Sequence, residues 1–108
     1  MLPKKSRIPR KLFTELLSGS RFVHSPFLTL RFKALTNSSS KAGVSVSKKV
    51  SKSAVIRNTV RRRIYATVAP MLKETKNYLF LFVAKPGVQN IKGENLSKEI
   101  LKLLSAVT

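Results

Sequence analysis

Residues 43–64 read Gly43-Val-Ser-Val-Ser-Lys-Lys-Val-Ser-Lys-Ser-Ala-Val-Ile-Arg-Asn-Thr-Val-Arg-Arg-Arg-Ile64, and two periodicities follow each other in this stretch. Apolar and polar side chains alternate over 44–47, which predicts a strand. From residue 53 onward apolar side chains recur every three or four positions, which predicts a helix over 53–69 that Pro70 ends. The centre of the predicted fold is therefore a strand that leads through two lysines into a basic helix.

The predicted helix has one apolar side and one polar side. We expect the apolar side to face the core. Its members are Ile56, Val60, Ile64, Val68 and Met71. The polar side carries Asn58, Arg61, Arg62 and Tyr65, with Arg57 and Arg63 on its flanks. No acidic residue lies three or four positions from these arginines to pair with them, so a negatively charged partner explains them better than a solvated surface does.

The residues before this stretch predict a further helix and a further strand. Pro9 suits the start of a helix and Gly19 its end, and the apolar residues between them predict a helix over 9–18. Residues 27–34 alternate imperfectly and predict a strand. Residues 36–43 are mostly polar and predict a turn, so the strands 27–34 and 44–47 are expected to form a hairpin.

The residues after the basic helix predict a central strand and a last helix. Residues 78–84 form a continuous apolar run, as expected of a strand that is buried on both faces. Five apolar residues at helical spacing predict the last helix, with Asn95 as its cap. They are Leu96, Ile100, Leu103, Leu104 and Val107. The order α-β-β-α-β-α predicts one α+β domain over 1–108, a two-layer sandwich with a flexible basic arm at 1–7.

Charge indicates the kind of partner. The chain has 22 Lys and Arg against 4 Asp and Glu, a net charge of +18 on 108 residues. Sixteen of the basic residues, including all eight arginines, precede Ile64. Such a charge destabilises a folded chain by self-repulsion, and guanidinium groups bind phosphate in a bidentate manner. We therefore expect the first two thirds of the chain to contact nucleic acid.

The composition offers little support for catalysis or membrane insertion. The chain has one histidine, His24, four glutamates, and neither Cys nor Asp, so an acid–base pair would need His24 and a distant Glu. It has no glycine-rich phosphate loop and no metal-ligand cluster. No apolar run approaches about 18 residues, and the start lacks the features of a signal peptide. We expect a soluble, cytoplasmic domain whose partner supplies any chemistry.

The stretch 43–50, followed by 54–64, resembles the signature of the ribonuclease P protein family. In that family a glycine-led strand ends in Ser-Lys-Lys, and the next helix carries an Arg-Asn-Arg motif followed by more basic residues. The resemblance extends over nearly the whole chain, including a helix with Phe13, a strand at Phe27 and the run 82–87. It implies a mixed sheet with a left-handed crossover that carries the basic helix.

The resemblance also implies a function and its site. The chain would be the protein subunit of an endoribonuclease whose RNA subunit uses Mg²⁺ to remove the 5′ leader of precursor tRNA, and the protein itself would hold no cofactor, metal or catalytic residue. The basic helix would contact the ribonuclease P RNA, and a cleft between the sheet and the two helices would take the leader. Matches to the basic motif are Lys49, Arg57, Asn58, Arg61 and Arg62, to which Lys48 and Tyr65 are added by position. The cleft positions are Phe13, Leu17, Phe27 and Leu30.

The chain departs from the family pattern at several of these positions. Thr59 replaces the second arginine of the motif, and Tyr65 stands where a further arginine is common, although its ring on the polar side could stack on a base. Leu17 and Leu30 occupy positions that are often aromatic, which weakens base stacking there. The residues Ser51 to Ser53 make the connection one residue longer than usual. For Phe13 and Phe27, core packing and leader contact are equal alternatives.

Three other classes of protein fit part of the pattern. A ribosomal protein or general RNA chaperone would share the charge and size, but it does not explain the strand-to-helix motif. A DNA-binding module would need a helix-turn-helix before residue 53, where the sequence predicts a strand. A toxin-like ribonuclease would need a pair of catalytic groups that the sequence lacks. We therefore expect ribonuclease P RNA and precursor tRNA as partners, and neither DNA nor a membrane.

Overall fold

A computed structural model describes residues 7–72, 74, 76–91 and 93–107. The described residues form a sheet of four strands, β1 (Arg21–His24), β2 (Leu28–Ser39), β3 (Lys41–Ser45) and β4 (Lys76–Ala84). The helices are α1 (Arg10–Gly19), α2 (Ala54–Leu72) and α3 (Gly93–Val107), with a 3₁₀ turn, η2 (Val88–Asn90), before α3. Of the predicted basic arm at 1–7, only Arg7 lies within the described residues, and it forms an isolated β-bridge with Ala42.

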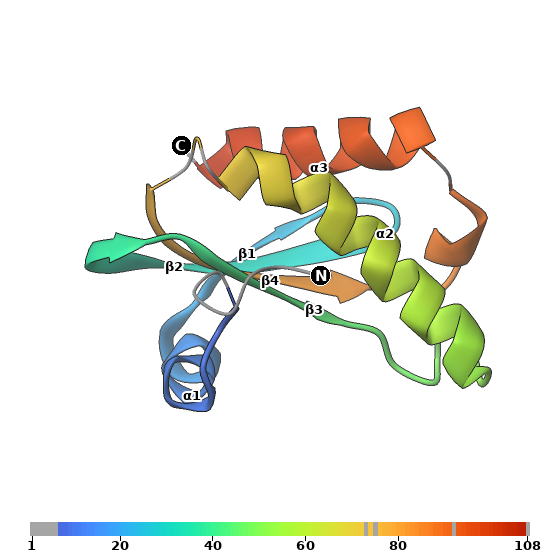
Figure 1. Cartoon of the computed structure of the whole chain (residues 1–108), viewed down its shortest axis with the longest axis horizontal. Helices are drawn as coiled ribbons and strands as arrows, with labels where there is room; N and C mark the ends of the chain where they lie inside the picture. The colour runs from blue at the N-terminus through green and yellow to red at the C-terminus, as the bar shows by residue number, and fades with distance from the viewer. Residues whose placement is uncertain (1–6, 73, 75, 92, 108) are drawn as a thin grey trace.

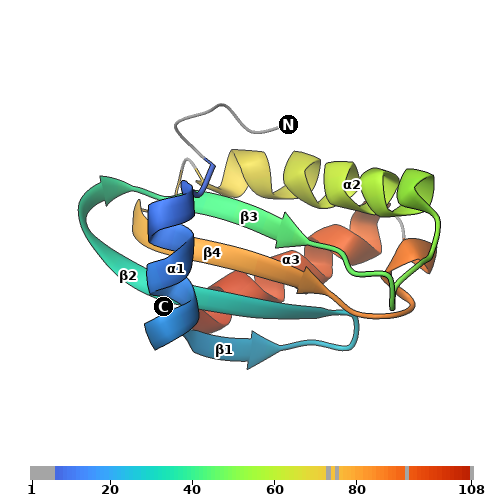
Figure 2. The ribbon, with the colours of Figure 1, turned by 90° about the horizontal axis from the view of Figure 1, so that it is seen from below.

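The sheet is mixed, and helices cover both of its faces. The strands lie in the order β1-β2-β4-β3, with β2 antiparallel to β1 and β4 and with β3 parallel to β4. Helices α2 and α3 lie on one face, and α1 lies on the other (Figure 1). Seen from the α1 side, α1 crosses only one end of the sheet (Figure 2). The predicted α+β class is confirmed, and α1 adds a partial layer to the predicted sandwich.

The connection from β3 through α2 to β4 is a left-handed crossover. In Figure 2 both strands point to the right, β3 lies above β4, and α2 lies behind the sheet. Nearly all connections between parallel strands have the opposite hand, because strand twist favours the right-handed path. The left-handed crossover agrees with the one that the family resemblance implies.

The predicted hairpin between the second and third strands is wrong. The polar stretch 36–39 continues β2, with a register shift between Ala34 and Ser39, and β3 begins at Lys41. Strand β3 then pairs with β4 and not with β2. The apolar run of β4 explains this outcome, because a strand buried on both faces is most stable with a neighbour along each edge.

Strand β4 divides the interior into two apolar clusters. Phe80 and Phe82 point toward α2 and α3, while Leu79 and Leu81 point toward α1, and all four are at most 4% exposed. Burying a side chain of this size contributes about 1.5–3 kcal/mol. The prediction of a central strand buried on both faces is confirmed.

The core side of α2 was predicted well in its middle and less well at its ends. Val60, Ile64 and Val68 are buried, as expected, but Ile56 is 43% exposed. Figure 2 shows the first turns of α2 running past the end of β3, and Ile56 belongs to these turns. At the other end the helix continues through Pro70 to Leu72, which is buried. A proline in the last turn removes only one hydrogen bond, so it did not end the helix where we predicted.

Two further details differ from the prediction. Strand β1 is an additional element, and its four residues, three of them exposed, carry too short a pattern to indicate a strand. Helix α3 begins at Gly93, so Asn95 is an exposed residue of its first turn and not its cap.

Candidate nucleic-acid interface

The loop between β3 and α2 presents the two predicted lysines to solvent. Lys48 and Lys49 are exposed in a turn that the buried side chains of Val46 and Val50 anchor on either side. The Val50 N–H donates to the Ser47 carbonyl oxygen at 3.1 Å, and Gln89 Nε2 donates to the Val50 carbonyl oxygen, also at 3.1 Å. The loop therefore holds the lysines close to the start of α2, whose dipole also attracts anions.

The first turn of α2 is fixed by side chains. Ser53 caps it, since its Oγ accepts a hydrogen bond from the Ile56 N–H at 3.3 Å. Arg57 Nη1 donates to the carbonyl oxygens of Ser51 and Lys52, 3.0 Å away in each case. Arg57 thus holds the loop, while Lys48 and Lys49 extend into solvent.

Four of the predicted residues meet around one hollow on the polar side of α2. Asn58, Arg61, Arg62 and Tyr65 line a space of about 240 Å³. Their spacing of three, one and three residues places them in one stripe along the helix. Arg61 Nη1 donates to Asn58 Oδ1 at 2.6 Å, so these two polar groups are held together.

Tyr65 differs from its neighbours in this stripe because it is tied to the sheet. Its Oη accepts a hydrogen bond from the Val44 N–H of the edge strand β3 at 3.2 Å. Its ring is half-buried and packs against the core cluster shared by α2, α3 and the sheet. The sequence pattern placed Tyr65 with the polar residues, and the structure shows that it spans the boundary between the polar side and the core.

The predicted leader positions do not gather in one place. Leu17 and Phe13 lie on α1; Leu17 is 48% exposed, and Phe13 packs against the cluster beneath α1. Leu30 faces the opposite side of the sheet and is completely buried, so the structure contradicts its predicted contact with the leader. Phe27 also packs against the opposite cluster, and its ring lies 2.8 Å from where a Cβ on Gly87 would be. Core packing therefore accounts for Phe27.

An aromatic and cationic group that the sequence did not reveal lies on the open part of the face that carries α1. Phe22 is 51% exposed, and the guanidinium carbon of Arg31 lies 4.6 Å from its ring centroid. The His24 ring is parallel to Phe22 within 4°, and its Nδ1 shares a hydrogen bond with Thr29 Oγ1 at 3.0 Å. Phe22 pairs with Arg31, and His24 pairs with Thr29, across β1 and β2. The register between β1 and β2 brings these four residues together, and the sequence alone did not indicate that register.

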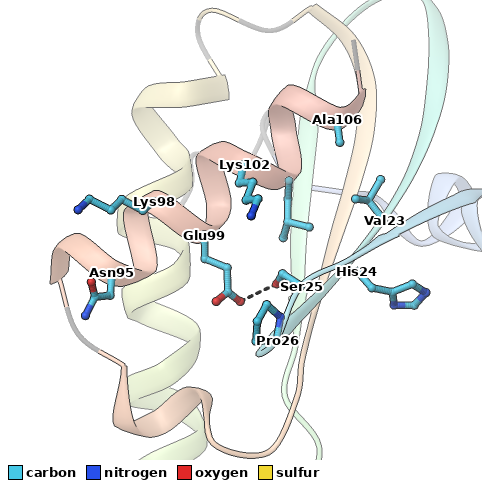
Figure 3. Close-up of a pocket in the computed structure, with 10 residues that line it drawn as sticks. Val23, His24, Ser25, Pro26, Asn95, Lys98, Glu99, Lys102 and Ala106 are labelled. Atoms are coloured by element: carbon cyan, nitrogen blue, oxygen red, sulfur yellow. Dashed lines mark hydrogen bonds between the residues drawn. The ribbon is translucent and has the colours of Figure 1, made fainter.

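A larger hollow, of about 440 Å³, lies between α3 and the turn that follows β1 (Figure 3). Glu99 there accepts hydrogen bonds from Ser25 Oγ at 2.6 Å and from the Phe27 N–H at 3.1 Å. The His24 ring points away from this hollow in Figure 3. The histidine and the glutamate therefore engage different partners, and Glu99 fixes the turn.

No helix among the described residues is both long and apolar enough to cross a bilayer.

Residues 2–108 match the family model described as ribonuclease P. The chain belongs to the ribonuclease P protein family. It is 32% identical to the ribonuclease P protein component of Synechococcus sp., over 96% of this chain and 83% of that one. It is 30% identical to the component of Pseudanabaena sp., over 94% of each chain.

Solved structures of ribonuclease P proteins share the fold. The protein from Thermotoga maritima matches with a TM-score of 0.83 at 15% identity, covering 94% of this chain and 97% of that one. A structure from Staphylococcus aureus matches with a TM-score of 0.78 at 16% identity and covers 95% of each chain. As a member of this family, the chain is a subunit of a ribonucleoprotein endoribonuclease that processes tRNA, and it works with a ribonuclease P RNA. The alternative of a ribosomal protein or RNA chaperone is set aside.

Proposed function

We propose that this ribonuclease P protein binds the ribonuclease P RNA through the polar side of α2 and the loop before it, and the 5′ leader of precursor tRNA through the open face of the sheet beside α1. The observation that carries the proposal is the arginine stripe of α2. Arg61 and Arg62 lie side by side around one hollow, with Lys48 and Lys49 exposed near the start of the same helix. Crowded cations of this kind are stabilised by phosphate groups.

The open sheet face suits a single-stranded leader. Proteins bind unpaired nucleotides by stacking bases on exposed aromatic rings while cations contact the backbone. Phe22 supplies an exposed ring that Arg31 and His24 hold in place, and Leu17 adds an exposed apolar side chain from α1. In this proposal Phe22 and Arg31 take the role that the sequence assigned to Phe27 and Leu30.

The chemistry is assigned to the RNA. Among the described residues no group of three or more His, Cys, Asp or Glu side chains lies close enough to hold a metal ion. In this proposal the holoenzyme's requirement for Mg²⁺ belongs to the RNA subunit. The protein contributes binding energy for both RNAs and reduces repulsion between them by adding positive charge. We place this activity in the cytoplasm, with neither DNA nor a membrane as partner.

Reconstituted cleavage tests the proposal. The protein is added to its cognate ribonuclease P RNA and to precursor tRNA at low Mg²⁺, where repulsion between RNA phosphates limits the RNA alone. Leader removal should be faster with the protein than without it, and the protein alone should cleave nothing. A lack of stimulation, or cleavage of precursor tRNA by nuclease-free protein alone, would contradict the proposal.

A further inference from the structure

The hollow on α2 has the size and walls of a site for a planar group. It measures about 240 Å³ and is lined by Asn58, Arg61, Arg62 and Tyr65. Cations alone would be sufficient to bind phosphate. This hollow adds an aromatic ring, and every base has a face that can stack on such a ring.

The aromatic wall is fixed before any ligand binds. The hydrogen bond from the Val44 N–H to Tyr65 Oη holds one end of the side chain, and core packing holds the ring. A side chain that is already ordered loses little conformational entropy on binding. Tyr65 is therefore a preorganised stacking surface.

The polar walls present mainly hydrogen-bond donors. Asn58 Oδ1 already accepts from Arg61, which leaves the Asn58 amide N–H groups and the remaining guanidinium N–H groups of Arg61 and Arg62. Guanine presents two neighbouring acceptors, O6 and N7, which match a guanidinium fork. Adenine presents a donor beside N7, so it matches this lining less well.

We propose that the hollow on α2 takes an unpaired guanine of the ribonuclease P RNA, with the base stacked on Tyr65 and its O6 and N7 facing Arg61 and Arg62. The inference rests on the proposed function, since it concerns the RNA-binding side of α2. With this site, the polar side of α2 would recognise one base in addition to binding phosphate groups.

Interference mapping tests this assignment. Ribonuclease P RNA is transcribed with phosphorothioate-tagged 7-deazaguanosine at random positions, each molecule lacking N7 at one or a few guanines. Molecules bound by the protein are separated from unbound ones, and the tagged positions are read by iodine cleavage. With the wild-type protein we expect one guanine, or a small cluster, to be depleted from the bound fraction by about 5-fold or more, as for loss of a good base contact.

Variants assign the depleted guanine to the hollow. Asn58→Ala removes an exposed side chain and frees Arg61, so depletion should weaken with the fold intact. Tyr65→Leu retains an apolar side chain against the core but removes the ring, so depletion should be lost. Arg63→Ala is the matched control, because Arg63 is exposed on the same helix but does not line the hollow. It should weaken overall binding and leave the depleted position unchanged.

Two results distinguish the possible failures. If the wild-type protein binds the RNA but no 7-deazaguanosine is depleted, or if depletion persists in both Asn58→Ala and Tyr65→Leu, the guanine site is wrong and the hollow binds phosphate only. If the wild-type protein does not bind the RNA at all, the proposed function and this inference are both overturned.

Discussion

Arg57 Nη1 donates a hydrogen bond to the carbonyl oxygen of Ser51 at 3.0 Å, so the basic helix holds the loop that leads into it. A second bond from the same nitrogen to the Lys52 carbonyl oxygen reinforces the contact. The family motif suggested an RNA contact for Arg57. The structure adds a positioning role, in which one guanidinium orders the backbone beside Lys48 and Lys49.

Arg57→Lys should therefore lower the stability of the protein, although the substitution keeps the positive charge. The lysine side chain ends one bond short of the position of Nη1, so its ammonium group cannot reach both carbonyl oxygens, and the free energy of unfolding should fall by about 1 kcal/mol. Amide hydrogen exchange at residues 51–53 should speed up. Arg62→Lys is the control, because Arg62 is exposed, and it should leave exchange at the loop unchanged. Unchanged exchange in Arg57→Lys would show that the clamp does not order the loop.

Substitutions on the buried side of α2 should lower stability, whereas substitutions on its polar side should lower RNA affinity. Ile64 is completely buried, so Ile64→Ala should lower the free energy of unfolding by about 2–5 kcal/mol through lost burial and a cavity. Arg62 is exposed among like charges, so Arg62→Ala should leave stability nearly unchanged while weakening RNA binding by about 1–3 kcal/mol.

Thermal melts and RNA titrations on both variants measure this division. The opposite pattern, in which Arg62→Ala unfolds the protein and Ile64→Ala does not, would mean that α2 is rotated relative to the structure described above.

Gly87 should not tolerate a side chain. Its φ of 98° lies in the left-handed region, and an added Cβ would sit 2.8 Å from the Phe27 ring. Gly87→Ala should therefore destabilise the protein by more than about 2 kcal/mol, combining backbone strain with a steric clash. Gly93→Ala is a matched control, because Gly93 also has a positive φ, 51°, but nothing lies within 4 Å of its added Cβ. Equal losses of stability, measured by urea unfolding, would show that contact with Phe27 contributes nothing.

The open sheet face should bind the leader by stacking. Phe22→Ala should weaken binding of a single-stranded leader oligonucleotide by about 1–3 kcal/mol, because an exposed ring is removed. Phe22→Tyr retains the ring and should bind as the wild type does. Affinity for the ribonuclease P RNA should be the same in all three proteins, since Phe22 is not on α2. If fluorescence titration shows equal leader binding by Phe22→Ala and the wild type, the leader does not use this face.

The sequence predicted those features that depend on local periodicity. The buried side of α2 at Val60, Ile64 and Val68 and the doubly buried strand at Phe80 follow from spacings within a few residues. Such spacings reflect which side of an element meets the core. The basic stripe at Arg61 and Arg62 was visible for the same reason.

Features that depend on contacts between distant residues were not predicted. Strand β4 has two edges, and the sequence does not show which strand pairs with the second one. The polar stretch 36–43 favoured a hairpin between the strands before and after it, whereas β3 pairs with β4. In a strand, a shift of one residue exchanges the two faces. The family resemblance assigned Leu30 to the leader, whereas the strand register places Arg31, and not Leu30, on the α1 side. The family motif assigned Arg57 to RNA, and its hydrogen bonds to the preceding loop leave no periodic signal in the sequence.

The dependence of RNA affinity on salt tests most directly whether α2 is the RNA interface. Each phosphate contact that is lost removes about 0.7 to 0.9 from the slope of log affinity against log salt. For the cognate ribonuclease P RNA we expect a steep slope in the wild type, flattened by about 0.7 to 0.9 in each of Lys48→Ala, Lys49→Ala and Arg63→Ala, whose exposed charges lie outside the hollow. Lys98→Ala removes an exposed charge from α3 and should leave the slope unchanged. Wild-type slopes in all three interface variants, or an equal flattening in Lys98→Ala, would contradict the account.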